Sequence, residues 1–384
     1  MTALFAVNDL AYFRAHRQPL AEALVDRGYR VILLADPARV EPVLDGDPWE
    51  LRPVSVERHR LNIVKDAKLA LAIAKLVRNE KPDLLHLLTI KPVLFGALAT
   101  AWIVSTQQRR SLKSVWTFPG LGTLFAGSSS PAKRRFVEFA LKLCAKRLKP
   151  VVTTENTADS RRLANGALLG TGIAPSTLNG TGLDLEHFRP AQCSAKKGML
   201  VFGLAARLLK AKGVGAFLHA AEVLSGKAKF VLAGLPAPGN PDAFPLDQIH
   251  KAVSRGHVEF HEGVSQRQMP SLLRSIDVFC LPTTYPEGLP RSLIEAAACG
   301  CALIATDQES IKRLVEEDKT GWLIGADQTL AAQLAKRCEN AIANPDKARA
   351  MGKAASVHIR GLGVSDQDVI NQFLTLYGLE TNPS

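Results

Sequence analysis

The sequence has 384 residues, enough for two domains of ordinary size, and 47% of them are hydrophobic. The best candidate for a membrane span, residues 92–104, is too short to cross a bilayer. Most of the formal net charge of +12 lies in residues 1–190, which hold 27 Lys and Arg against 17 Asp and Glu. We therefore expect the first half to meet something anionic, although it lacks the interleaved aromatic and basic residues that favour nucleic acid.

Strands and helices alternate through the first half. Residues 1–9 have neither a basic segment nor a long apolar one, so we expect a first strand and not a signal peptide. The predicted strands are 4–7, 30–34, 84–88, 114–117 and 151–154, and the predicted helices are 14–27, 66–79, 92–104, 131–148 and 157–165. This alternation predicts a parallel sheet covered by helices.

The alternation stops at a polar stretch, 191–197, and then resumes. We place the domain boundary there, which gives domains 1–190 and 191–384. The second series has predicted strands 200–204, 230–233, 258–260, 278–281 and 302–305, and predicted helices 213–224, 248–255, 269–275, 290–299 and 364–376. The last helix, 364–376, could also pack back on the first domain. Two doubly wound α/β domains in series predict a cleft at the carboxyl ends of both sheets, where ligands bind.

The cysteines give no sign of a disulfide framework. They lie at 144, 193, 280, 299, 301 and 338, without Cys-x-x-Cys spacing. Cys280 falls in an apolar strand, and Cys299 and Cys301 flank a glycine. We therefore predict buried free thiols and a reducing, cytosolic compartment.

Two glutamates give the most informative pattern in the chain. Glu287 and Glu295 flank a Gly-Leu-Pro turn, and Glu295 lies in an Ala-rich helix that Pro290 can open without losing a hydrogen bond. The free N–H groups and the positive dipole at a helix start can bind a phosphate. Carboxylates on either side of it could accept hydrogen bonds from sugar hydroxyls, which predicts a nucleotide-sugar site. Solvated glutamates in an ordinary loop and helix are the simpler alternative.

A pair of cations opens the second domain. Arg207 and Lys212 lie five residues apart on a loop that leaves the carboxyl end of a predicted strand. Two cations there could clamp a diphosphate and neutralise the charge that develops on a leaving nucleotide. A solvated basic loop is the alternative, in which neither side chain has a ligand.

The run from Pro286 to Gly300 resembles the signature of the retaining glycosyltransferases of family 4. These enzymes have the GT-B fold, in which two Rossmann-like domains face each other across a cleft. The segment from Arg207 to Gly213 resembles the Arg-Leu…Lys-Gly element of the same family. The resemblance therefore implies an α/β GT-B protein with an acceptor-binding domain, 1–190, and a nucleotide-sugar-binding domain, 191–384.

The resemblance also implies roles in the second domain. The residues implied as catalytic are Arg207 and Lys212, which would stabilise the leaving diphosphate, and Glu287, which would contact the donor sugar. The implied donor-binding residues are Glu295 at the ribose, the backbone of Gly288 and Leu289 at the sugar or phosphate, and Val258 and Phe260 near the base. Pro290 replaces the glycine of many relatives and offers no N–H, so one backbone contact of the family is not expected here.

In the first domain the candidates concern the acceptor side. Residues 118–125, with Gly120 and Gly122, resemble the loop that faces the donor sugar, but they include no histidine where many members have one. His16 and Arg17 could face the cleft from the first loop, or they could cap or cover a surface helix. Lys91, between a strand end and a helix, is a candidate for acceptor or phosphate contact.

The predicted helix 131–148 is basic and amphipathic, with Glu138 as its single acid. Such a helix suits an anionic membrane surface. The Asp-x-Asp spacing of metal-nucleotide sites occurs at Asp45–Asp47 and Asp366–Asp368, but neither segment follows an apolar strand. We predict turn and cap residues there, no metal and no cofactor, with a nucleotide sugar as co-substrate.

The resemblance extends to bacterial cell-surface enzymes through Thr89-Ile90-Lys91-Pro92 and the Gly-Leu-Gly stretch. It implies a retaining hexosyl- or N-acetylhexosaminyltransferase that uses a nucleotide-diphosphate sugar, with UDP favoured over GDP. The implied acceptor is a polyprenyl-diphosphate-linked sugar, lipopolysaccharide or another polysaccharide, at the inner face of the cytoplasmic membrane. The alternatives are a sugar-nucleotide 2-epimerase of the same architecture, which needs no acceptor, and a non-catalytic nucleotide-sugar-binding subunit.

Overall fold

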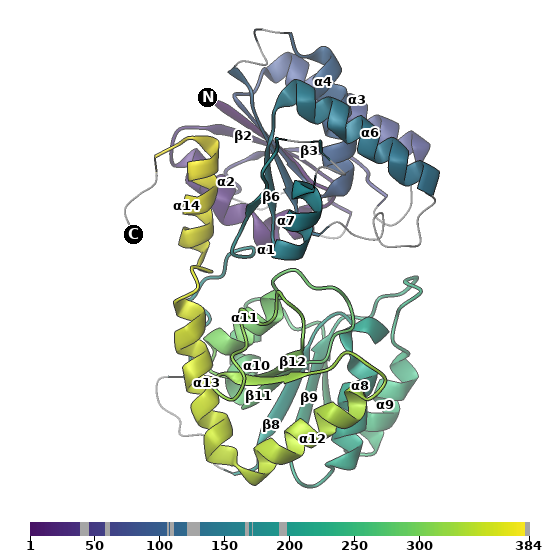
Figure 1. The fold of residues 1–384 in the computed structure, drawn as a ribbon, viewed down its shortest axis with the longest axis vertical. Coiled ribbons are helices and arrows are strands. Elements are labelled where there is room, and N and C mark those ends of the chain that lie inside the picture. The colour runs from purple at the N-terminus through teal and green to yellow at the C-terminus, as the bar shows by residue number, and fades with distance from the viewer. Residues whose placement is uncertain are drawn as a thin grey trace. The chain divides into compact units, whose positions relative to one another are not determined.

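The computed structural model describes the chain except residues 39–45, 58–61, 106, 108–110, 121–130, 166–168, 171, 192–197 and 381–384. Contacts divide the chain into two compact units (Figure 1). Unit 1 consists of Met1–Gly182 with Asp366–Ser384, and unit 2 consists of Leu183–Ser365. Leu183 and Phe188, which precede the boundary expected at 190, are buried in the core of unit 2.

Unit 1 is built on a parallel sheet of seven strands in the order β3-β2-β1-β4-β5-β6-β7. The strands are β1 (Thr2–Ala6), β2 (Arg30–Ala35), β3 (Glu50–Pro53), β4 (Leu84–Leu88), β5 (Lys113–Phe118), β6 (Val151–Thr154) and β7 (Ser176–Thr177). The five strands expected from the sequence form the centre. The two edge strands, β3 and β7, were not predicted, because a short, half-exposed edge strand lacks the apolar run of a buried one.

The described helices of unit 1 include two where the sequence predicted one. They are α1 (Leu10–His16), α2 (Gln18–Val25), α3 (Ile63–Glu80), the π-helical turn Pro92–Gly96, α4 (Ala97–Ile103), α6 (Pro131–Leu148), α7 (Thr157–Ala164) and α14 (Asp366–Tyr377). The expected helix 14–27 is interrupted at Arg17, whose φ is −137°, and Pro19 lies in the first turn of α2. Since proline has no N–H to continue a helix, a new helix begins there.

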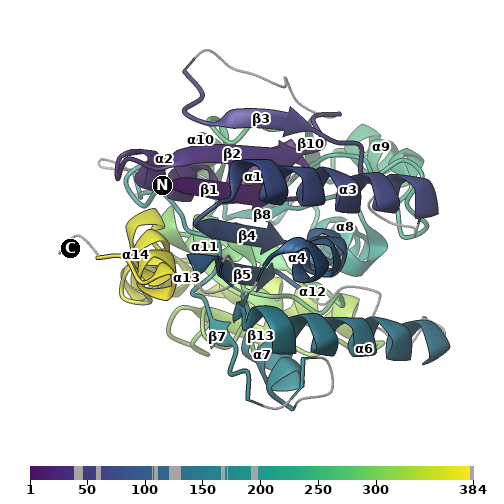
Figure 2. The same ribbon diagram turned by 90° about the horizontal axis from the view of Figure 1, so that it is seen from above.

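Helices cover both faces of the unit 1 sheet. In the view of Figure 2, α3, α4 and α6 lie on one side and α2 and α14 on the other. The side chains of a strand alternate between the two faces, so Leu4 joins the core under α3, α4 and α6, whereas Phe5 joins the core under α2 and α14. The last helix of the chain therefore completes the core of unit 1.

Unit 2 repeats this plan with a parallel sheet of six strands in the order β10-β9-β8-β11-β12-β13. The strands are β8 (Val201–Ala205), β9 (Lys229–Gly234), β10 (Glu259–Glu262), β11 (Val278–Leu281), β12 (Ala302–Thr306) and β13 (Gly321–Ile324). The helices are α8 (Val214–Val223), α9 (Leu246–Ser254), α10 (Met269–Ser275), α11 (Arg291–Ala298), α12 (Leu330–Ala343) and α13 (Pro345–Arg360), with a 3₁₀ turn at Lys210–Lys212.

Two cores lie on the two faces of this second sheet. Residues of α8, α9 and α12, among them Phe217 and Ile249, fill one core, and residues of α10 and α11, among them Leu273 and Leu293, fill the other. Each unit is thus a parallel sheet between helical layers, and the predicted α/β class with two Rossmann-like domains is confirmed.

The described cysteines fit this packing. Cys144, Cys280, Cys299, Cys301 and Cys338 are all buried thiols. Cys193 lies outside the described residues. Within the described ranges, no helix combines the length and the apolar character that a membrane span requires.

Candidate active site

Three neighbouring strands of unit 2 bring the candidate catalytic residues Arg207, Lys212 and Glu287, together with Gln308, to one edge of the sheet. Arg207 and Lys212 follow β8, Glu287 follows β11, and Gln308 follows β12. The strands β8, β11 and β12 are adjacent and parallel, so their carboxyl ends lie together. This edge is where open α/β sheets bind ligands.

A glycine allows the loops after β8 and β11 to meet. Gly213 has a φ of +78°, and a Cβ atom at this position would lie 2.1 Å from the carbonyl oxygen of Pro282. The backbone N–H of Thr284 also donates a hydrogen bond of 2.8 Å to the carbonyl of Ala211. A glycine is required here both for its left-handed backbone and for its lack of a side chain. Lys212 is thereby held against the loop that contains Glu287.

Lys212 and Glu287 form an ion pair. The Lys212 Nζ lies 2.5 Å from Glu287 Oε1, and the two side chains are 17% and 10% exposed. The Thr283 hydroxyl is 2.9 Å from the same carboxylate oxygen, and the ring of Tyr285 lies under the ammonium at 5.6 Å. The pair is therefore shielded from water on several sides but still reachable, as a charged group that meets a polar ligand must be.

The loop that carries Glu287 is braced from the end of β12. The Gln308 side chain donates to the carbonyl oxygens of Thr283 and Tyr285 at 3.1 and 3.0 Å and accepts a 3.0 Å hydrogen bond from the N–H of Glu287. The Ser310 hydroxyl donates to the Glu287 carbonyl at 3.0 Å. Thr283, Gln308 and Ser310 were not predicted from the sequence. Their only sequence signal is a position just after an apolar strand.

Glu295 lies deeper than Glu287. It is in the second turn of α11, only 5% exposed, and accepts a 2.8 Å hydrogen bond from Arg291 Nε. Burial raises the pKa of the Glu295 carboxyl, and Arg291 offsets this only in part. Pro290 is the N-cap of α11, so the helix starts at Arg291, one residue later than expected.

The other expected donor-side residues differ in exposure. Arg207 is exposed, and its side chain forms no ion pair with any residue that the structure describes. Gly288 is partly buried, and Leu289 is packed into the core beneath α11. The Arg207 guanidinium is therefore a cation at the same edge that a ligand can reach, whereas Leu289 can offer a ligand only its backbone.

Val258 lies apart from the other expected donor-side residues, and its role near the base stays a prediction. Val258 precedes β10 and lies at the amino end of this strand, on the opposite edge from Lys212 and Glu287, and its side chain is buried in the core. Phe260, within β10, is half-buried and packs against the same core. The apolar pattern that marks a buried strand locates core residues, whereas a ligand meets the residues beyond the carboxyl end of the strand.

In unit 1, two of the candidate cations are committed to buried ion pairs. The guanidinium of Arg17 is 1% exposed and 2.5 Å from Glu155. The Lys91 ammonium is 2.7 Å from Asp66, and both side chains are almost fully buried. An ion pair at such depth is costly to break, so a contact of either cation with an acceptor would have to compete with it, and that role stays a prediction.

The remaining candidates of unit 1 lie nearer the surface. His16 ends α1 and packs against Tyr12, with 4.7 Å between the ring centroids. Gly120 is exposed just after β5, and a Cβ atom at this position would have no neighbouring atom within 4 Å. Gly122 lies outside the described residues. A role for these residues on the acceptor side stays a prediction.

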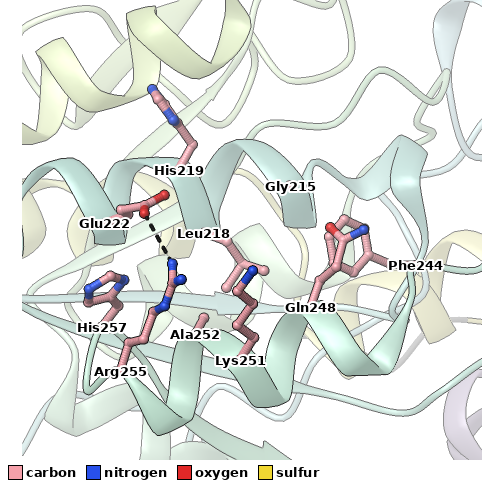
Figure 3. Close-up of a pocket in the computed structure, with 10 residues that line it drawn as sticks. All are labelled: Gly215, Leu218, His219, Glu222, Phe244, Gln248, Lys251, Ala252, Arg255 and His257. Atoms are coloured by element: carbon pink, nitrogen blue, oxygen red, sulfur yellow. Dashed lines mark ion pairs between the residues drawn. The ribbon is translucent and has the colours of Figure 1, made fainter.

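A separate groove of about 430 Å³ opens between α8 and α9 (Figure 3). Its charged and titratable lining residues are His219, Glu222, Lys251, Arg255 and His257. The Arg255–Glu222 ion pair in the groove spans 3.6 Å between side chains that are more than half exposed, so water screens it. No residue expected to bind the donor lines this groove, which is therefore separate from the candidate active site.

The acidic and other potential metal ligands are not gathered into one cluster in the part of the chain that the structure describes. Among the described residues, no group of three or more His, Cys, Asp or Glu side chains could hold a metal ion. In the first Asp-x-Asp segment, Asp47 accepts two hydrogen bonds from Arg14, at 2.8 and 2.7 Å. In the second, Asp366 and Asp368 lie in the first turn of α14. Acidic side chains in a first turn are favoured by the helix dipole.

Comparison with known proteins places both units. Residues 189–358 match the model of the glycosyl transferases group 1, and residues 14–166 match the glycosyl transferase 4-like domain. The chain is 26% identical, over 76% of its length and 77% of the relative, to N,N'-diacetylbacillosaminyl-diphospho-undecaprenol alpha-1,3-N-acetylgalactosaminyltransferase of Campylobacter jejuni. It is 28% identical, over 45% of each chain, to the amylovoran biosynthesis glycosyltransferase AmsK of Erwinia amylovora.

Solved structures agree at the level of the fold. HepE from Anabaena in complex with UDP superposes with a TM-score of 0.77 over 99% of this chain and 100% of that one, at 19% identity. The two family models together match most of the chain, in the same order as the two units. The chain thus belongs to the group 1 glycosyl transferases, enzymes of the GT-B fold, with a glycosyl transferase 4-like domain as its first unit.

Proposed function

We propose that this glycosyltransferase moves a sugar from a UDP-sugar to a lipid-linked or polysaccharide acceptor, with retention of configuration at the anomeric carbon. The observation that supports it best is the Lys212–Glu287 pair, held at the carboxyl edge of the unit 2 sheet by Thr283 and Gly213. The proposed retention rests on the family 4 signature from Pro286 to Gly300.

The geometry suggests how the donor is held. The Lys212 ammonium is neutralised by its ion pair with Glu287. A donor diphosphate competes for that ammonium, and Arg207 supplies a second cation from the same loop. The Glu287 carboxylate then becomes available to accept hydrogen bonds from the sugar. The two cations stabilise the negative charge that grows on the departing UDP, and this charge is larger in the transition state than in the bound donor.

The names of the relatives guide the choice of substrates. HepE was crystallised with UDP and with glucose, and the Campylobacter relative is named for the transfer of N-acetylgalactosamine to a diphospho-undecaprenol-linked sugar. We therefore favour a UDP-hexose or UDP-N-acetylhexosamine as donor and a polyprenyl-diphosphate-linked sugar as acceptor, in the synthesis of a cell-surface glycan.

The surface of unit 1 favours work at a membrane. Among the residues that the structure describes, 15 large hydrophobic side chains are exposed. Eight of them lie on the three helices that cover one face of the unit 1 sheet: Ile63, Val64 and Leu71 on α3, Trp102 and Ile103 on α4, and Phe136, Phe139 and Leu143 on α6. Cations such as Arg135 and Lys146 lie among them. Apolar and basic side chains on one face suit the interface of an anionic bilayer, so we place the enzyme at the inner face of the cytoplasmic membrane.

The donor and the reaction can be tested together. Purified protein is given UDP- and GDP-sugars with and without a membrane extract, and free nucleotide is measured. We expect acceptor-dependent release of UDP, reduced about 100-fold or more in Lys212→Ala, because a cation at the leaving group is lost. Lys210→Ala, at an exposed position of the same turn, is the matched control and should stay near wild type. The anomeric configuration of the product, read by NMR, tests retention.

The same assay separates the alternatives. Interconversion of the nucleotide sugar without acceptor would identify an epimerase. Saturable binding of a nucleotide sugar with no release under any condition would identify a non-catalytic binding subunit. Equal losses in Lys212→Ala and Lys210→Ala would remove the special role of the Lys212–Glu287 pair.

A further inference from the structure

One cavity of unit 1 lies apart from the residues proposed to bind the donor. It measures about 770 Å³ and lies between the second half of α6, the start of β6 and residues 169, 170 and 172–174. Val151 and Val152 open β6 and so lie at the amino edge of the sheet. Ligands of the reaction are expected at the carboxyl edge, so this cavity is not part of the proposed transfer site.

Lysines supply the charge of this cavity. Lys142, Lys146 and Lys149 line it, and none of its described lining residues is acidic. Lys142 and Lys146 are one helical turn apart on α6, and Lys149 follows the end of that helix. All three side chains are exposed, so their charges are hydrated and able to meet a ligand from solvent. The cavity therefore favours an anion.

Apolar groups form the other walls. Ala145, Pro150, Val151, Val152, Leu169 and Ile173 contribute them. Most of these side chains are packed in the core, and the apolar surface that reaches the cavity comes mainly from the half-buried Val151 and Ile173. A free phosphate would leave this surface wet, whereas a molecule with both a phosphate and a hydrocarbon segment would cover it. The volume of about 770 Å³ is ample for a phospholipid head group with the first part of an acyl chain.

The cavity also adjoins the apolar surface of the same helix. Leu143, exposed together with Phe136 and Phe139, follows Lys142 directly, and the Arg147 guanidinium lies 5.6 Å from the ring of Trp102. A bilayer that meets this surface would bring its head groups to the three lysines. The occupant that matches charge, hydrophobicity and position is thus a membrane lipid.

We propose that this cavity binds one anionic phospholipid, with its phosphate among Lys142, Lys146 and Lys149 and the start of an acyl chain against the apolar walls. The proposal rests on the proposed work at a membrane and adds to it a site for an individual lipid. It differs from general attraction to a charged surface, because a site of fixed shape saturates at one lipid and can be blocked without a change of charge.

The experiment uses the full chain and dihexanoyl-phosphatidylglycerol below its micellar concentration, followed by titration calorimetry. We expect saturable binding of one lipid. Ala174→Trp, which fills the cavity from an exposed lining position without altering charge, should weaken binding at least tenfold. The double variant Lys142→Gln/Lys149→Gln should do the same. Lys227→Gln/Lys353→Gln, which removes two exposed lysines from unit 2, is the control for net charge and should bind like wild type.

Each other outcome would overturn the proposal in a definite way. Equal affinity for inorganic phosphate would mean a simple anion site, and equal affinity for dihexanoyl-phosphatidylcholine would mean an apolar groove without head-group selection. Unchanged binding in Ala174→Trp would place the lipid elsewhere. Sedimentation with vesicles of increasing phosphatidylglycerol content tests membrane attachment separately. Attachment without binding of the monomeric lipid would keep the proposed function and remove the lipid site.

Discussion

The carboxylate of Glu287 owes its position to side chains that are distant in the sequence. Lys212 approaches it from the loop after β8, Thr283 from the end of β11, and Gln308 holds its backbone from the loop after β12. Thr283 is fully buried, so water cannot replace the carboxylate as the hydrogen-bond partner of its hydroxyl. A carboxylate held in this way keeps one orientation before the nucleotide sugar binds, and such preorganisation favours catalysis.

Thr283→Val tests this positioning. The variant keeps the shape of the side chain but removes the hydroxyl that lies 2.9 Å from Glu287 Oε1. Because a hydrogen bond to a charged group contributes about 1.5 kcal/mol, we expect kcat/KM for the donor to fall about tenfold. Steady-state kinetics with varied UDP-sugar measures the change, and Thr283→Ser should restore it.

Thr284→Val is the matched control. Its hydroxyl lies 3.4 Å from the carbonyl oxygen of Ala211, it makes no hydrogen bond to Glu287, and the residue is exposed. We expect nearly full activity. If both valine variants lost activity equally, or if Thr283→Ser failed to recover it, the effect would belong to the loop as a whole and not to the hydroxyl.

His86 predicts a pH dependence of stability. It is fully buried in β4, with Nε2 2.6 Å from the Thr117 hydroxyl and Nδ1 2.7 Å from the Tyr377 hydroxyl. Burial lowers the pKa of His86 well below its usual value, and the nearby Arg17 lowers it further. As the pH falls, His86 of the unfolded chain, with its normal pKa, binds a proton, whereas His86 of the folded chain stays neutral. The stability from this site is complete above about pH 6.5 and is lost as the pH falls below it.

Urea unfolding at two pH values measures this effect. When the pH is lowered from about 7.5 to about 5.5, the free energy of unfolding of the wild type should fall by about 1.4 kcal/mol more than that of a His86→Gln variant. The comparison with the variant cancels the contributions of all other groups. Equal pH dependence of wild type and variant would mean that His86 titrates normally in the folded protein.

At the scale of the elements, one glycine decides how a helix and a loop meet. Gly213→Ala would force a left-handed backbone on alanine and place its Cβ against the carbonyl of Pro282. The backbone penalty alone is about 1 to 2 kcal/mol, and the clash with backbone adds to it. We therefore expect the free energy of unfolding of unit 2 to fall by more than about 3 kcal/mol, with weaker binding of UDP because Lys212 is displaced.

Gly226→Ala separates the two causes. Gly226 has nearly the same φ, +76°, but a Cβ there would have no atom within 4 Å. Only the backbone penalty of about 1 to 2 kcal/mol should appear, and UDP binding should be unchanged. Chemical denaturation and a UDP titration of both variants check this. Similar losses in the two would show that close approach to Pro282 has no importance.

Strands and helices were predictable from the sequence where their pattern of buried residues is regular. The central strands of both sheets follow from short apolar runs, and the long helix α3 follows from its periodicity. The prediction failed where local chemistry overrides the pattern. The expected helix 14–27 breaks before Pro19, and the edge strand β3 is too polar to be recognised.

The candidate site was predictable only in part for a related reason. Lys212 and Glu287 are found because their motifs place charged residues after buried strands. Thr283 and Gln308 lie on different loops, 25 residues apart in the sequence, and the Gln308 side chain donates a hydrogen bond to the Thr283 carbonyl. Such contacts arise from the order of the strands in the sheet, which single motifs do not contain.

The two units do not simply follow each other along the sequence, because unit 1 is made of two separate stretches of the chain. The chain builds unit 1, then unit 2, and its last helix α14 returns to the core of unit 1. Tyr377 of this helix bonds to His86, and Phe373 lies 5.2 Å from the Arg17 guanidinium. Unit 1 is therefore complete only after the last residues of α14 have been synthesised, whereas the core of unit 2 consists of a continuous stretch of chain.

Phe373→Ala tests the consequence that the two units have separate cores. Phe373 is fully buried in unit 1, and truncating a buried phenylalanine costs about 3 to 5 kcal/mol. Scanning calorimetry should show a lower transition for unit 1, while UDP still binds and stabilises unit 2, because the proposed donor site lies wholly in that unit. Phe217→Ala, equally buried but in unit 2, should lower the other transition and weaken UDP binding. Loss of UDP binding in Phe373→Ala with a folded unit 2 would instead mean that unit 1 contributes directly to the nucleotide site.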